Sequence, residues 1–239
     1  MPRISVVIPA YNEEINIGNC LASLCAQNVR EEFEVIVVDN NSTDNTVQIA
    51  ESFGDRLHIR VLSEKKQGRG AARKCGWDAA IGDIVFSTDA DATVPEHWIS
   101  SFVTMLDTHQ DCIGVYGSVR INDCGLFRNT VFNAFHPLFL RSYRMLFRNH
   151  LLCGFSFALK KDAYEQAGGF NPENNGQEDV DLSKRVSHVG NVRYDKRTPV
   201  TFSGRRFQNG LLKGTWEYAY IFFHICIRGN HEVELTNRR

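Results

Sequence analysis

Two aspartates separated by one small residue, Asp89-Ala90-Asp91, carry the clearest chemical signal in this chain. They follow an apolar run, Ile84-Val85-Phe86, which predicts a buried strand that ends just before them. Open α/β sheets bind ligands at the carboxyl ends of their strands. Two carboxylates at this spacing suit a hard divalent cation that bridges the oxygens of a diphosphate. The alternative is a solvated acidic turn before the next helix.

Strands and helices alternate along the first half of the sequence. Strand-like runs cover residues 4–8, 33–38, 58–62 and 84–87, and helical spacing of apolar residues follows each of them. The first of these helices is expected to open at Asn12, as an Asx cap. This alternation predicts one α/β domain with a mostly parallel central sheet flanked by helices. Further strands are expected at 113–119 and 155–159, and a helix after residue 178.

Composition narrows the class of protein. The 239 residues are 43% hydrophobic, which is enough for a sizeable core, and the net charge of −1 argues against bulk nucleic-acid binding. Seven cysteines without zinc spacing indicate reduced thiols in a cytoplasmic protein. The first residues run straight into a strand, so no signal peptide is expected, and 211–227 is too polar to span a membrane.

Six sequence blocks, in order, resemble those of glycosyltransferase family 2. They are VVIPAYNE (6–13), VVDNNSTDNT (37–46), GRGAAR (68–73), TDAD (88–91), GGF (168–170) and EDVDL (178–182). The resemblance implies the A-type glycosyltransferase fold and an inverting transfer from a nucleotide-sugar donor. It also implies a catalytic domain over 1–210, with a donor-binding half at about 1–120 and an acceptor-binding half at about 121–210. Residues 211–239 would form a C-terminal amphipathic extension.

The resemblance places the donor's base between two strand ends. Pro9, Ala10, Tyr11 and Glu13 lie in the loop after the first strand, and Asp39 ends the second. The loop backbone would frame the flat ring, and Asp39 would accept a hydrogen bond from a ring N–H. The alternative for Asp39 is a turn-forming residue before the run Asn-Asn-Ser.

A second part of the donor site is expected at a helix N-terminus. Gly68, Arg69 and Arg73 combine a flexible approach with nearby cations, which suits a diphosphate. The alternative is a solvated basic loop that continues from Lys65 and Lys66.

The same resemblance makes the D-x-D motif a Mg²⁺ or Mn²⁺ site that neutralises the leaving diphosphate. Asp91 is expected to ligate the metal directly, and Asp89 to act through water or the ribose; Ala90 lies between them. Many relatives carry a histidine near the position of Phe202 and Ser203 that completes the metal shell. This sequence has none there, so water is expected to take that place.

An inverting transfer to a hydroxyl needs a general base. Asp179 lies three residues before Leu182 and seven before Val186, so it should share their inward-facing stripe, whereas Glu178 should not. Spacing and resemblance therefore favour Asp179 as the base. Asp181 should lie outside. The alternative is ordinary acidic decoration of a first helical turn, which contributes about 0.3–1 kcal/mol.

Two further segments remain open. Arg206 and Phe207 resemble a degraded Q-x-x-R-W element, in which they would contact the diphosphate or acceptor together with Glu178; a surface basic turn is the alternative. Residues 126–152 interleave aromatic and basic side chains, as in a helix lying on an anionic bilayer, with 211–227 as a second candidate. A helix packed on the sheet, or one in a homodimer interface, is equally consistent with this pattern.

The sequence therefore predicts a metal-dependent inverting glycosyltransferase that acts on a hydroxyl of a glycan or a lipid-linked saccharide, at the inner face of the membrane if the basic helix binds there. A polyprenyl-phosphate sugar synthase is one alternative, because an acceptor phosphate needs no base. A binding module that holds nucleotide sugars without turnover is another. No nucleic-acid partner is expected.

Overall fold

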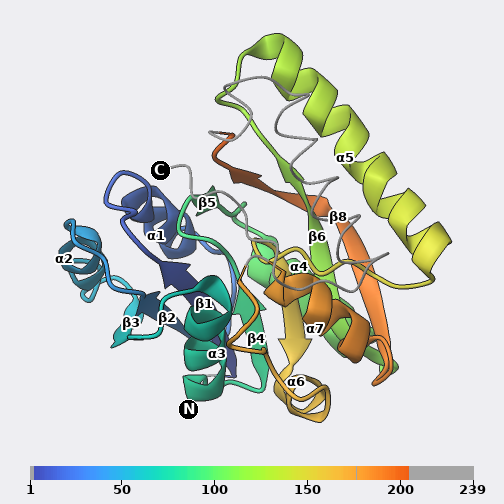
Figure 1. The fold of residues 1–239 in the computed structure, drawn as a ribbon, viewed down its shortest axis with the longest axis horizontal. Coiled ribbons are helices and arrows are strands. Elements are labelled where there is room, and N and C mark those ends of the chain that lie inside the picture. Colours follow the sequence, from blue (N-terminus) through green and yellow to red (C-terminus); the bar gives the residue numbers. More distant parts are fainter. Residues whose placement is uncertain (1–2, 176, 205–239) are drawn as a thin grey trace.

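The computed structural model describes residues 3–175 and 177–204. In these residues one eight-stranded sheet has the order β3-β2-β1-β4-β7-β6-β8-β5 (Figure 1). The strands are β1 (Ile4–Ala10), β2 (Phe33–Asp39), β3 (His58–Ser63), β4 (Ile84–Ser87), β5 (Ala92–Thr93), β6 (Cys112–Arg120), β7 (Phe157–Lys160) and β8 (Asn191–Phe202). The helices are α1 (Ile17–Cys25), α2 (Thr46–Glu51), α3 (Arg69–Ala79), α4 (Trp98–Thr108), α5 (Leu126–Phe147), α6 (Lys161–Gln166) and α7 (Glu178–Val186).

The sheet is mostly parallel, as predicted. Strands β3, β2, β1 and β4 run in parallel, and β6 pairs in parallel with β8. Strand β7 runs antiparallel to both its neighbours, β4 and β6, and β5 runs antiparallel to β8. The prediction of a single α/β domain with a mostly parallel central sheet is confirmed.

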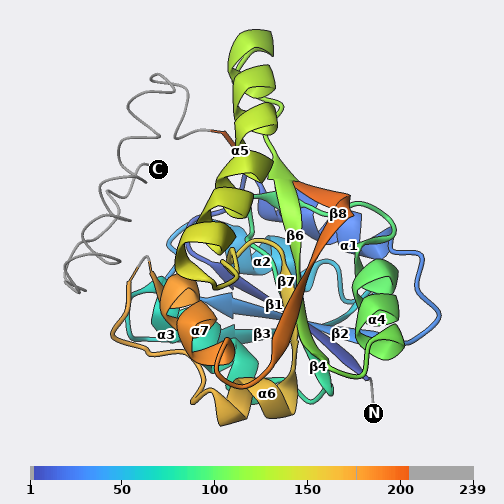
Figure 2. The same cartoon turned by 90° about the vertical axis from the view of Figure 1, so that its right-hand side faces the viewer.

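Helices cover both faces of the sheet, and each face has its own core. Side chains of α1, α2 and α4 form one apolar cluster with the strands, and those of α3, α6 and α7 form the other. Figure 2 shows α3, α6 and α7 on one side of the sheet and α4 on the other. Because both faces are covered, β1, β2 and β4 are buried almost throughout, which explains their continuous apolar runs.

The first helix begins later than predicted. Asn12 has φ of 52°, and α1 starts at Ile17 after Asn16. The side chain of Asn12 accepts a hydrogen bond from Thr43 N (2.8 Å) instead of capping its own helix. Asparagine tolerates this left-handed conformation better than most residues, so the residue type serves a loop-to-loop contact here. Helix α6 and strand β8 were not predicted from the sequence.

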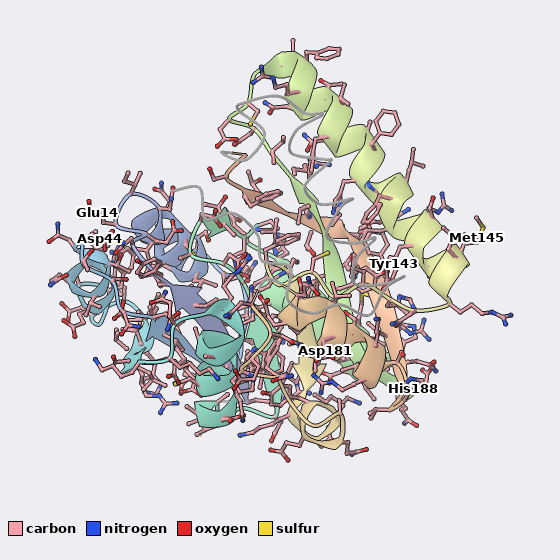
Figure 3. The ribbon with its side chains drawn as sticks, in the orientation of Figure 1. Glu14, Asp44, Tyr143, Met145, Asp181 and His188 are labelled. Carbon is pink, nitrogen blue, oxygen red and sulfur yellow. The ribbon has the colours of Figure 1, made fainter. Side chains whose placement is uncertain are left out.

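Helix α5 confirms the predicted helical segment but not its single aromatic face. Tyr143 is buried and Phe132 packs against Phe202, whereas Phe135 and Phe139 are exposed. Figure 3 shows Tyr143 and Met145 on different sides of this helix.

Across residues 3–175 and 177–204, no helix is long and apolar enough to cross a bilayer.

Candidate active site

Three strands bring predicted site segments to one edge of the sheet. Ala10 at the end of β1 is in register with Asp39 at the end of β2, and Asn40 N donates to Ala10 O (2.9 Å). On the other side of β1, Thr88 N donates to Val7 O (3.2 Å) directly after β4. Pro9 and Ala10, which the sequence placed in the loop, are the last residues of β1, because both pair with β2, and Tyr11 and Glu13 follow in the loop. This segment, the carboxylate of Asp39 and the D-x-D turn therefore share the carboxyl edge of parallel strands.

The loops after β1 and β2 are bound to each other. Asn12 N donates to Ser42 Oγ (2.9 Å), and Glu13 N donates to Thr46 Oγ1 (2.8 Å). Glu14 and Asp44 lie next to each other at the outer end of this contact (Figure 3). In these bonds, backbone N–H groups of the first loop donate to side-chain oxygens of the second, so the two sides of the predicted base pocket are fixed relative to each other.

Asp39 is nearly buried, with 9% of its surface exposed. Its Oδ1 accepts a hydrogen bond from Ser42 N (3.1 Å), so the turn-forming role that the sequence left open is present. Recognition of a base by Asp39 stays a prediction.

Asn40 makes a structural contact at the candidate site that sequence reasoning missed. Its Nδ2 donates to Glu64 O (2.8 Å) and Lys66 O (2.7 Å), and its Oδ1 accepts from Gly68 N (2.7 Å). One buried amide thereby holds the basic 64–68 loop against the end of β2. An Asn-Asn pair in a polar turn gives no signal of burial, so the sequence pointed only to a turn.

Two positions at the start of α3, Gly68 and Gly70, require glycine. Gly68 has φ of 138°, which side-chain-bearing residues rarely adopt. A Cβ at Gly70 would lie 2.3 Å from Asn174 O, so this glycine allows the first turn of α3 to pack against the loop at 171–174. The close approach places Arg69 and the N-terminus of α3 next to the segment that leads into α7.

Arg73 joins the two acidic segments of the predicted site. Its Nη2 contacts Asp89 Oδ1 (2.6 Å) and its Nε contacts Glu178 Oε1 (3.2 Å). Its Nη1 donates to Ser87 Oγ (2.5 Å) and Gly154 O (3.0 Å). Only 1% of Arg73 is exposed, so its guanidinium is surrounded by protein groups. The D-x-D turn and the start of α7, 89 positions apart in sequence between Asp89 and Glu178, are thus tied together by one side chain.

Burial alone would lower the pKa of Arg73, but the carboxylates of Asp89, Glu178 and Asp179 outweigh it and raise that pKa. The guanidinium therefore stays charged. A buried ion cluster of this kind persists only because each charge has a partner, and removal of one partner is strongly destabilising. This geometry favours a positioning role for Arg73 over direct contact with a diphosphate.

Asp179 is half-buried at the start of α7. Its Oδ2 accepts from Gly154 N (3.0 Å), and its Oδ1 accepts from Val180 N (2.8 Å). Burial and, after it, the neighbouring Glu178 raise the pKa of Asp179 to about 6, although Arg73 opposes the rise. A carboxylate with this pKa is ionised at neutral pH and still basic enough to accept a proton.

The prediction that Glu178 faces outward was wrong. Glu178 is only 2% exposed and lies against Arg73, more deeply buried than Asp179. The reason is helical spacing: Glu178 precedes Leu182 by four residues, which places it on the same face as effectively as a spacing of three. Asp181 is half-buried and pairs with Arg185 on the same helix (2.7 Å; Asp181 is labelled in Figure 3).

The D-x-D turn has a buried centre and two partly exposed acids. Ala90 is 2% exposed, while Asp89 and Asp91 are half-buried. Ser203 N donates to Asp91 O (3.2 Å), so the segment after β8 lies beside the motif. Ser203 is one of the positions at which the resembled family often has a histidine.

The charge around this turn fits a cation. Cys20 donates to Asp89 O (3.4 Å), and burial together with the nearby carboxylates of Asp91, Asp89 and Glu13 raises the pKa of its thiol. The carboxylates of Asp91, Asp89 and Glu13 all act on this one thiol, so they lie in the same small region. Mg²⁺ and Mn²⁺ are commonly bound by one or two carboxylates plus substrate phosphates, so the donor set is chemically suitable. Within the described residues, no three His, Cys, Asp or Glu side chains are grouped so that they could hold a metal ion.

Arg206, Phe207 and residues 211–239 lie outside the described residues. Their predicted roles stay predictions.

The overall fold is that of A-type glycosyltransferases. TarS 1-349 of S. aureus in complex with UDP-GlcNAc aligns with a TM-score of 0.69 at 20% identity, covering 85% of this chain and 59% of that one. The mannosyltransferase PcManGT of Pyrobaculum calidifontis, in complex with GDP-Man and Mn²⁺, aligns with a TM-score of 0.67 at 21% identity over 92% and 64%. These likenesses establish the fold.

The family model of glycosyl transferase family 2 matches residues 5–168, which is more than half of the chain. The chain belongs to this family. Glycosyltransferase AglE of Haloferax volcanii is 37% identical over 119 residues, 48% of this chain and 39% of AglE. The undecaprenyl-phosphate 4-deoxy-4-formamido-L-arabinose transferase of Proteus mirabilis is 32% identical over 118 residues, 47% of this chain and 36% of the relative. The chain thus spans less than half the length of these curated relatives.

Proposed function

We infer that this chain is an inverting glycosyltransferase that moves a sugar from a nucleoside-diphosphate sugar to an acceptor hydroxyl. The observation that carries this inference is the bridge made by Arg73 between Asp89 and Glu178. It brings a D-x-D turn suited to a diphosphate-bound cation next to a carboxylate suited to general-base catalysis. Family membership supports the donor class, because two structures with this fold contain nucleotide sugars.

Asp179 is the proposed base. As the acceptor oxygen attacks the anomeric carbon, Asp179 takes the hydroxyl proton, and the bond from that carbon to the diphosphate oxygen breaks with inversion. Its bonds to the backbone at Gly154 and Val180 fix its carboxylate. Arg73 holds the two acidic segments together, and burial with the neighbouring Glu178 keeps the pKa of Asp179 high enough for proton transfer.

The diphosphate end of the donor is assigned to the D-x-D turn and the N-terminus of α3. Asp91, with Asp89 in an indirect role, would hold Mg²⁺ or Mn²⁺, which when bound neutralises the leaving diphosphate. The charge of Arg69 acts to lower the pKa of Asp179, which supports placing Arg69 close to this part of the site. Asp39 and the 9–13 loop would hold the base.

The Proteus mirabilis relative favours a second candidate, a transferase whose acceptor is a polyprenyl phosphate. Such an acceptor is already ionised and needs no base. Replacement of Asp179 with Asn separates the two: it should abolish transfer to a hydroxyl and leave transfer to a phosphate largely intact.

Thermal unfolding in the presence of UDP, GDP or dTDP with Mn²⁺ tests the donor assignment. A ligand at 100 times its Kd stabilises the folded state by about 2.7 kcal/mol, a readily measured shift. We expect one diphosphate to stabilise the protein with Mn²⁺ and less in chelator, and Asp91→Ala to remove the metal-dependent part. Absence of stabilisation by all three nucleotides would overturn the proposal.

A further inference from the structure

Helix α5 carries two unusual surfaces. Seven large apolar side chains are exposed along it, from Leu126 at 86% and Phe127 at 76% in its first turn to Met145 at 78% near its end. Its buried side, with Leu140 and Tyr143, packs on the body of the protein and makes its main contacts with β6. The exposed apolar residues on the other side are Phe127, Phe135, Leu138, Phe139, Met145 and Leu146.

These residues form one face. With 3.6 residues per turn, these six fall within an arc of about 120° that begins beside the buried side; Leu126 lies outside this arc, and Arg128 is the one cation within it. Arg141 and Arg144 are exposed and fall within a neighbouring arc of about 60°, and the exposed Arg148 follows directly after the last helical residue. Helix α5 therefore has a core face, an apolar face and a cationic face in succession. We call the apolar and cationic faces together the α5 outer surface.

The charge on this surface has one sign. Residues 124–161 contain six Lys or Arg and no Asp or Glu, in a chain whose net charge is −1. Cationic side chains on a surface helix are ordinarily interspersed with acids that form pairs at spacings of three or four. Their absence here leaves the arginines suited to an external anionic surface, next to apolar side chains suited to a hydrocarbon boundary.

We propose that α5 lies in the surface of an anionic lipid bilayer, with its apolar face inserted at the headgroup–acyl boundary and its arginines on the headgroups. Charge complementarity selects this occupant over a neutral apolar partner. Figure 1 shows that α5 runs along one margin of the molecule, and Figure 2 shows that its first turns project beyond the body.

Both ends of α5 adjoin the candidate active site. Before the helix, Cys124 Sγ contacts Gly204 O (2.9 Å), one residue from Ser203, which bonds to Asp91. After the helix, Gly154 N bonds to Asp179 Oδ2 (3.0 Å). A bilayer on α5 would hold the site close to the lipid surface, so the acceptor class is a hydroxyl of a lipid-linked saccharide; this step rests on the proposed function.

Flotation with lipid vesicles tests the membrane surface without reference to catalysis. The full chain should float with vesicles of equal parts phosphatidylglycerol and phosphatidylcholine, and much less with phosphatidylcholine alone or at high salt. R141Q/R144Q/R148Q should weaken binding to the anionic vesicles about a hundredfold. F135S/L138S/M145S should also abolish flotation.

Matched controls keep the result specific to α5. R30Q/R56Q/K196Q removes three exposed cations from other surfaces, and I15S/I81S removes two exposed apolar side chains elsewhere. Both controls should float like the parent chain. All variants should keep the thermal shift produced by the nucleoside diphosphate, so that failure of membrane binding and failure of donor binding are read separately.

Three outcomes would overturn the proposal. In the first, the parent chain does not float with anionic vesicles. In the second, the parent and the α5 variants float equally, which places the contact elsewhere, such as within residues 205–239. In the third, the parent forms a dimer that the apolar variant dissociates, and the variant floats like the parent.

Discussion

Arg73 and the arginines of α5 occupy opposite environments in one molecule. Arg73 is 1% exposed and is held between Asp89 and Glu178, whereas Arg141, Arg144 and Arg148 are exposed in a stretch without a single acid. A net charge of −1 conceals both arrangements. The comparison indicates that the first arginine holds two acidic segments together inside the protein, whereas the others are available to the external anionic surface that we propose.

Removal of the buried charge should have the largest effect on stability. Arg73→Gln leaves Asp89 and Glu178 without their common partner, so we expect a loss of about 3–5 kcal/mol in the free energy of unfolding. Arg185→Gln is the matched control, because it breaks a half-exposed pair with Asp181 and should cost about 0–1 kcal/mol. Urea unfolding measures both. Equal losses of stability in the two variants would contradict the distinction between a buried and a half-exposed ion pair.

The second-largest loss of stability is expected when the hydrogen bonds of Asn40 to the 64–68 loop are removed. Asn40→Ala leaves Gly68 N and two carbonyl oxygens without their partner, so we expect a loss of about 1–3 kcal/mol. Asn45→Ala, in the exposed part of the same turn, should have a smaller effect. Nucleoside-diphosphate binding should weaken in the Asn40 variant because the 64–68 loop is released, and unchanged binding would remove this loop from the donor site.

The triple replacement of the α5 arginines should have the smallest effect on stability. Each position is exposed, and such surface substitutions usually change stability by less than about 0.5 kcal/mol. A large loss in urea unfolding would show that these arginines serve the fold and would break the comparison with Arg73.

The pH dependence of stability sharpens the assignment of Asp179. Its pKa is raised to about 6 in the folded protein, above the ordinary value near 4 in an unfolded chain. The folded state therefore binds the proton more tightly, and the contribution of Asp179 to stability falls as the pH rises from about 4 to 6. Asp179→Asn should remove this fall and be no less stable than the parent at neutral pH. A strongly destabilised variant would indicate that the ionised carboxylate serves the fold.

The sequence predicted the strand ends that position the site better than the burial of the charged side chains within it. Apolar runs ending in Asp39 and Asp89 placed both acids at one sheet edge, because parallel strands end together there. The sequence could not show that Arg73 is buried, because a basic residue near the start of a helix gives the same pattern whether it binds a phosphate or pairs with buried acids. Glu178 was misplaced because spacings of three and four define the same helical face.

Strand β8 and the division of α5 into separate faces depended on tertiary contacts. The strand mixes exposed and buried positions irregularly and includes register shifts against β6, so its period is obscured. The aromatic residues of α5 looked alike in sequence, and only packing against Phe202 and the core separates Phe132 and Tyr143 from Phe135 and Phe139.

The most direct test of the account is the rate of sugar transfer by Asp179→Asn beside Asp181→Asn, measured from pH 5 to 8 once a donor is known. We predict that the parent rate rises about tenfold per pH unit below 6 and levels above it, since the base must be ionised. Asp179→Asn should lose about 10²–10⁴-fold in rate while it retains donor binding, and Asp181→Asn should follow the parent. Transfer by Asp179→Asn at the parent rate, with the same pH profile, would contradict the central claim.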